Sequence, residues 1–125
     1  MAIIELVARI FLSTIFIAAA PRHFTAAAIA HAAELGVPLA RIAVPLSGAL
    51  AIVGGASVLV GFHARWGALA LVAFLVPVTF GMHAFWRLSD PVAVHVQQAM
   101  FVKNVAILGG VLLVAIHGAG AIAFD

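Results

Sequence analysis

The chain has 125 residues, of which 66% are hydrophobic and only 8% charged, with a formal net charge of +2 and no cysteine. A soluble domain of this size cannot bury so much apolar surface, since soluble proteins carry about 25% charged residues, so the composition predicts an integral membrane protein. The lack of cysteine excludes disulfides, thiolate metal sites and covalently attached haem, and the scattered basic residues give no reason to expect nucleic acid as a partner.

The first predicted membrane helix covers residues 3–20, enough to cross a hydrocarbon core of ~30 Å at ~1.5 Å per residue. Glu5 and Arg9 lie four residues apart in it, on one face and in the favourable order for an ion pair. The segment lacks a basic stretch followed by an uninterrupted apolar core. We therefore interpret it as a membrane span and not as a cleaved signal.

A short helix is predicted next, over residues 26–35. Thr25 is suited to cap its N-terminus and Gly36 to end it. The segment is too short to cross a membrane. We expect it to lie at the interface or to fold against the bundle.

The second and third membrane helices are predicted over residues 38–61 and 66–86, and the short turn between them requires antiparallel packing. Pro38 suits the first turn of the second helix. This helix has a small residue at every fourth position, which lets another helix approach closely. The positions are Ser47, Ala51 and Gly55.

Polar residues of the third helix are predicted to share one face at intervals of four. They are Thr79, His83 and Arg87. Trp66 and Trp86 lie near its two ends, as interfacial anchors do.

The fourth membrane helix, predicted over residues 93–116, has Lys103 and Asn104 side by side in an apolar run, with Gln97 a heptad before the asparagine. A lysine at the centre of a membrane helix costs about 2.5–3.5 kcal/mol, and each strong apolar neighbour returns about 0.3–0.6 kcal/mol, so the helix can still insert. Lys103 is therefore not expected to face lipid. It marks a bundle interior, a water-filled cavity or a ligand.

Together these elements predict an all-α fold of one domain over residues 1–125, a four-transmembrane-helix up-and-down bundle with both termini on one side. The alternating directions bring polar residues to the opposite end. These are Arg22, His23, His83, Arg87, Asp90, His95, Gln97 and Gln98. Counted along the helices, Arg9 and Lys103 reach similar depths, with Glu5 as the one embedded carboxylate. Surplus positive charge suits a ligand with acceptor oxygens: a quinone, a lipid head group or a small anion.

Several motifs occur along the chain. They are Arg9, Gly54-Gly55, His83 with Phe85-Trp86, and most specifically Phe101-x-Lys103-Asn104 followed by Gly109-Gly110, Gly118-x-Gly120 and Asp125. This combination resembles the DoxX family of small four-helix membrane proteins. The resemblance implies a bacterial inner-membrane protein, a subunit of a complex linked to quinone-coupled oxidation, with Arg9, His83, Trp86, Lys103 and Asn104 as the binding residues. The chain differs at Ala51, where the family often has an acid that would neutralise the buried cations.

Our leading hypothesis is a subunit of a redox or respiratory-type membrane complex that binds a quinone or lipid head group. It supplies no catalytic or metal-ligating residue, and acts as an oxidoreductase, if at all, only with its partners. The partners expected are lipids, other subunits and further copies of the chain. The main alternative is a structural accessory subunit, in which buried polar residues only fix helix packing. A small-anion carrier is weaker without inverted repeats, and two histidines, His83 and His95, are weak support for a haem.

Overall fold

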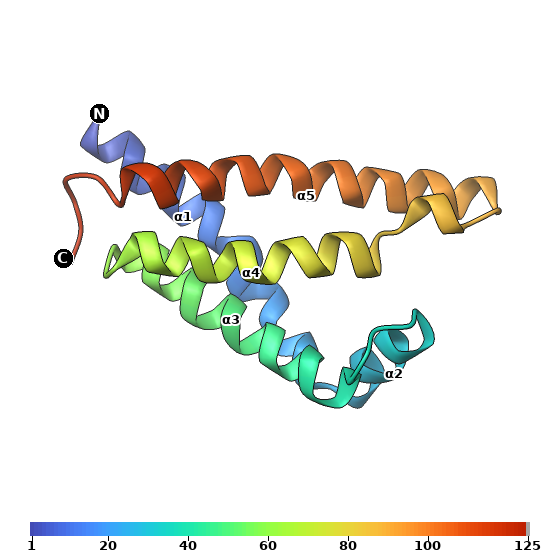
Figure 1. Ribbon diagram of the computed structural model, residues 1–125. Coiled ribbons are helices and arrows are strands. Elements are labelled where there is room, and N and C mark those ends of the chain that lie inside the picture. The colour runs from blue at the N-terminus through green and yellow to red at the C-terminus, as the bar shows by residue number, and fades with distance from the viewer. Residues whose placement is uncertain (125) are drawn as a thin grey trace.

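The structure, a computed structural model, describes residues 1–124 and is helical throughout, with no strand in that part of the chain (Figure 1). Its elements in order are α1 (Ala2–Ala19), η1 (Ala20–Phe24), α2 (Ala26–Glu34), α3 (Ala40–Val60), α4 (Ala64–Met82), η2 (Phe85–Arg87) and α5 (Pro91–His117). Four helical stretches are long and apolar enough to cross a membrane: Ala2–Phe24, Ala40–Val60, Ala64–Arg87 and Pro91–His117. The predicted all-α fold with four spans is confirmed.

The four long helices are arranged up and down. α3 packs on α1 and on α4, and α4 packs on α5, whereas α1 and α5 contact each other very little. Figure 1 shows both termini at one end and α2 at the other. The bundle is therefore well packed on three sides and weakly packed between its first and last helices.

Small residues on α3 allow the close packing of the middle of the bundle. A Cβ atom added at Gly54 would lie 2.8 Å from the backbone oxygen of Gly67 on α4, and one added at Gly55 would lie 3.1 Å from Ile17 on α1. Ala51, one turn before them, is fully buried. Of the predicted stripe, Ala51 is buried and Gly55 packs on α1, whereas the close contact with α4 is made by Gly54, which the stripe did not include.

The short helix α2 folds against the end of the bundle. The Thr25 hydroxyl accepts a hydrogen bond from the Ala28 amide at 3.2 Å, which caps the N-terminus. The helix ends at Glu34, and Gly36, just after the C-cap Leu35, has a φ of +86°. The amides of Gly36 and Val37 donate to the carbonyls of Ala33 and Ala32, which closes the turn as in a Schellman motif. Both predicted ends are confirmed, and the buried Ala32 packs against the start of α3.

The second span begins two residues later than predicted, at Ala40 and not at Pro38. Leu39 has a φ of +53°, in the left-handed region. A helix cannot pass through that conformation, so Pro38 lies in the preceding turn.

The third span ends earlier as an α-helix than predicted, at Met82. The chain then leaves helical geometry at His83 and forms the short η2, whose aromatic rings pack on α5. The ring centroid of Phe101 lies 5.6 Å from that of Phe85 and 5.7 Å from that of Trp86. The prediction that Arg87 continues one helical face is therefore wrong, because these ring contacts redirect the chain.

Candidate functional site

A cavity of about 500 Å³ lies in the half of the bundle opposite the termini. Every helix of the described chain except η2 contributes to its wall. Its polar lining residues are Arg22, His23, His31, Ser47, His83, Gln97, Lys103 and Asn104. No carboxylate lines it among residues 1–124, so its formal charge is positive.

A second hollow of about 600 Å³ lies between α2 and the start of α3. Alanine and aliphatic side chains line it, with Arg41 as its one polar member. It therefore offers little chemistry, and the cavity is the candidate site.

His23 is held in one tautomer by its partners on α3. Its Nδ1 lies 2.8 Å from the Ser47 hydroxyl oxygen, and that hydroxyl donates its single proton to the Val44 carbonyl at 2.6 Å. The hydroxyl can then only accept from the imidazole, so Nδ1 carries the hydrogen. This leaves Nε2 as the acceptor atom of the neutral ring.

His83 is held in the same way from α5. Its Nδ1 lies 2.7 Å from the side-chain carbonyl oxygen of Gln97. A carbonyl oxygen only accepts, so Nδ1 is again the donor and Nε2 the acceptor. Both histidines therefore line the cavity with one nitrogen engaged by protein and the other available to accept a proton or a hydrogen bond.

Asn104 forms a buried bridge between two helices. Its side-chain amide donates to the Thr79 hydroxyl on α4 at 3.1 Å. The two residues are 7% and 5% exposed. At Asn104 the structure therefore shows an interhelical hydrogen bond of the kind that stabilises membrane bundles.

Lys103 lies beside Asn104 but is exposed, near the middle of α5, at the edge of the cavity. Its Nζ donates only to the sulfur of Met100, at 3.5 Å, and a thioether is a weak acceptor. The lysine forms no ion pair within residues 1–124. Of the three settings expected for Lys103, a bundle interior, a cavity or a ligand, the structure places it at the edge of a cavity, exposed and with no ion pair among the described residues.

Arg9 is buried, at 3% exposure, but it lies outside the cavity lining. Its guanidinium donates to the backbone oxygens of Val58, at 3.4 Å, and of Ile122 in the C-terminal segment. The predicted ion pair with Glu5 is wrong, because Glu5 is exposed and pairs with no residue of the described chain. The Arg9 Nε and the Ser13 hydroxyl are buried without a partner among the described residues.

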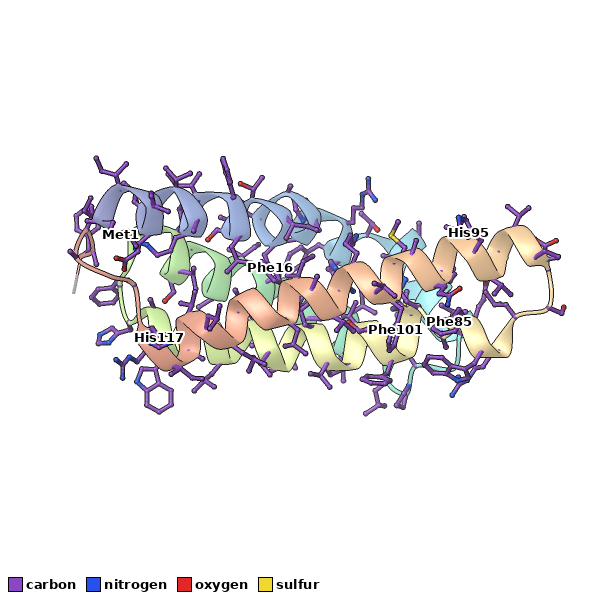
Figure 2. The ribbon with its side chains drawn as sticks, turned by 90° about the horizontal axis from the view of Figure 1, so that it is seen from above. Met1, Phe16, Phe85, His95, Phe101 and His117 are labelled. Atoms are coloured by element: carbon purple, nitrogen blue, oxygen red, sulfur yellow. The ribbon has the colours of Figure 1, made fainter. Side chains whose placement is uncertain are left out.

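Trp86 also lies outside the cavity lining. It is 51% exposed and packs in an aromatic cluster formed by Phe80, Phe85, Trp86 and Phe101. Figure 2 shows the labelled Phe85 and Phe101 in the half of the molecule away from Met1 and His117. Of the five predicted binding residues, the cavity therefore brings together His83, Lys103 and Asn104 and leaves out Arg9 and Trp86.

His95, the second histidine considered for a haem, is exposed on α5 and does not line the cavity, whereas His83 does.

Several lining residues were not among the predicted binding set. They are Arg22, His23, His31, Ser47 and Gln97. One signal was available for Gln97, because it lies seven residues before Asn104 and so on nearly the same helical face. The contact between His23 and Ser47 joins residues 24 positions apart, and no local pattern indicates it.

The fold and the cavity define a class: a small four-span membrane protein with a cationic, histidine-lined cavity in one half of its bundle. The model of the DoxX family matches residues 4–84, and the chain belongs to this family. The match includes Arg9 and His83 and ends before the motif around Lys103.

Two relatives from Escherichia coli (strain K12) extend the comparison. The chain is 36% identical to the inner membrane protein YqjF over 122 residues, which cover 96% of this chain and 88% of that protein. It is 29% identical to the inner membrane protein YphA over 97 residues, covering 78% and 69%. No solved structure matches the chain. Both relatives and the four spans agree with the predicted location in a bacterial inner membrane.

Proposed function

We propose that the protein is a subunit of a membrane redox complex that binds the oxygen-rich head group of a quinone or a lipid in its cavity. The observation that carries the proposal is the lining itself: two cations and three histidines, with no carboxylate among the described residues. Charge-assisted hydrogen bonds from Lys103 and Arg22 to ligand oxygens are about twice as strong as neutral ones. An anionic lipid head group would supply the counter-charge that the described chain does not, and a quinone would supply neutral acceptor oxygens to the same two cations.

The histidines offer a second set of contacts. The Nε2 atoms of His23 and His83 can accept hydrogen bonds from hydroxyl groups of a ligand, where the ligand has them. A quinol and a glycerol-based lipid head group both combine hydroxyl donors with acceptor oxygens. The protein would contribute binding and proton acceptance, whereas electron transfer would belong to the bound group and to partner subunits.

A structural accessory role is the second candidate. It is favoured by the bridge between Asn104 and Thr79, which needs no ligand. It is also favoured by the exposure of α5, of which only Asn104 and Val111 are buried within the described chain. In this case partner subunits would cover α5, and the cavity would have no specific occupant.

Replacing the cavity lysine separates the two functions. We expect Lys103→Met to weaken retention of decylubiquinone or of phosphatidylglycerol by about tenfold or more, since a hydrogen bond to a charged group contributes about 1.5–3 kcal/mol. The measurement is native mass spectrometry of the purified protein. Arg87→Met removes an exposed charge at the same end of the molecule, outside the cavity, and should leave retention unchanged.

If Lys103→Met retained both probes as well as the unmodified protein while still assembling with its partners, head-group binding would be abandoned for the accessory role.

A further inference from the structure

We propose that the cavity is filled from the side, out of the lipid, through an opening between α1 and α5. The occupant is an amphiphile whose head group enters the cavity while its apolar tail stays in the membrane. This inference rests on the proposed head-group binding and adds to it the route of entry and the need for a tail.

The register of α1 and α5 locates the opening. The two helices are antiparallel and meet where a Cβ atom added at Gly110 would lie 3.5 Å from the Leu12 side chain. One turn further from the termini, the antiparallel register places Ile15 opposite Ile107, and the next turn places Ala19 opposite Lys103. All four of these residues line the cavity, whereas Leu12 and Gly110 do not.

The two helices are therefore separated by the cavity from that level onward. Each packs on its other neighbour, α1 on α3 and α5 on α4, and contacts between them are few. Figure 2 looks onto α5 with α1 running along one side, and the labelled Phe16 lies between the end that carries Met1 and the end that carries His95. The gap lies within the apolar spans, so it faces lipid.

The end of the cavity is closed by a different element. Ala28, His31 and Ala32 of α2 form part of its wall. α2 is held there by its capped N-terminus and by the packing of Ala32 on the start of α3. Entry from the end requires α2 to move, whereas along the side route α1 and α5 share few contacts.

The lining chemistry has the order that an amphiphile needs. Apolar Ile15, Met100 and Ile107 lie along the opening, and Lys103 lies at its edge. His23 is hydrogen-bonded to Ser47 on α3, and His83 is hydrogen-bonded to Gln97 on α5. A head group can thus pass the lysine and reach the histidine acceptors while its tail remains against the isoleucines.

Bridging the two walls tests the route. The chain has no cysteine, so Ile15→Cys with Ile107→Cys creates one unique pair, which a bifunctional maleimide joins across the opening. Leu12→Cys with Gly110→Cys is the matched control, because the helices already meet there. Association of decylubiquinone and of dioleoyl phosphatidylglycerol is measured in nanodiscs, beside the tail-less 2,3-dimethoxybenzoquinone and glycerol 1-phosphate.

We expect bridging at positions 15 and 107 to lower the association rate of a tailed probe by about tenfold or more, with no effect of the control bridge and no comparable binding of the tail-less probes. The probe that responds identifies the source of the head group, quinone or lipid. Lateral entry is overturned if the bridged protein associates as fast as the unbridged one, or if tail-less probes bind equally well.

The experiment distinguishes a failure of head-group binding from a failure of lateral entry. If no probe binds the unbridged protein, head-group binding itself is wrong; if binding needs Lys103 but ignores the bridge, only the route is wrong. Should the cysteine pair fail to assemble, Ala19→Trp narrows the same opening from α1. Its control is Ala18→Trp, an exposed neighbour outside the lining, and the same rates decide the outcome.

Discussion

Lys103 and Asn104 are adjacent in the chain, yet they lie in different environments. Successive helical residues point about 100° apart. The asparagine is therefore buried against Thr79, while the lysine lies at the edge of the cavity. The apolar run around them predicts that neither side chain faces lipid freely. It cannot show which of the two neighbours has a structural role and which lines a binding cavity.

Gly54 packs directly against α4, and we expect this single-residue contact to contribute to stability. A Cβ atom there would lie 2.8 Å from the Gly67 oxygen and 2.9 Å from the Leu71 side chain. Gly54→Ala should therefore lower the free energy of unfolding by about 1–3 kcal/mol, because a backbone atom cannot move aside cheaply. The measurement is denaturation of the purified protein in detergent.

Gly109→Ala is the matched control, since an added Cβ atom there meets nothing within 4 Å. It should raise the stability slightly, by about 0.5–1 kcal/mol, through the better helix propensity of alanine. Equal destabilisation by both variants would contradict the assigned packing of α3 on α4.

Among the elements, α2 depends most on local signals, and for that reason its ends follow from the sequence. A capping threonine and a glycine with positive φ determine both of its ends. The end of α4 is different, because no proline or glycine follows Met82 directly and the chain instead turns so that Phe85 of η2 packs on Phe101 of α5. Contacts between distant residues cannot be derived from one stretch of sequence.

Loss of the cap should loosen α2 specifically. We expect Thr25→Ala to destabilise the helix by about 1 kcal/mol and to speed amide exchange in its first turn by about fivefold. Hydrogen exchange followed by mass spectrometry measures this.

Thr14→Ala serves as the comparison, since that hydroxyl bonds only to the Ile10 carbonyl within α1. Unchanged exchange in α2 after the loss of Thr25 would show that packing of Ala32 alone holds the helix.

On the scale of the whole molecule, hydropathy and alternation are enough to predict the bundle and the placement of both termini at one end of it. These two patterns predict the depth of a backbone position in the membrane, but they do not predict the depth of the charged group at the end of a long side chain. Arg9 and Lys103 reach similar depths by counting, yet the Arg9 guanidinium bonds to Val58 and Ile122 and so points to the end with the termini. Long basic side chains commonly extend away from their own Cα level, and this separates the two cations.

The arrangement of the spans is testable with single thiols, because the chain has no cysteine of its own. Ala2→Cys and Phe62→Cys should react with a membrane-impermeant maleimide from one side of the membrane, and Ser89→Cys from the other. Labelling of intact cells and of inverted vesicles gives the comparison. Reaction of all three from the same side would contradict the four-span arrangement.

The length of α5 links the cavity to the bilayer itself. The helix has 27 residues, about 40 Å at ~1.5 Å per residue, against a hydrocarbon thickness of ~30 Å. A helix longer than the hydrocarbon core is accommodated by tilt or by emergence of its ends, and the first turns of α5 carry the polar His95, Gln97 and Gln98. If the cavity is filled between α1 and α5 as proposed, a change in the tilt of α5 would change the width of that opening, because α5 is one of its walls and contacts α1 little. The acyl-chain length of the surrounding lipids would then control access to the cavity without any ligand or modification of the protein.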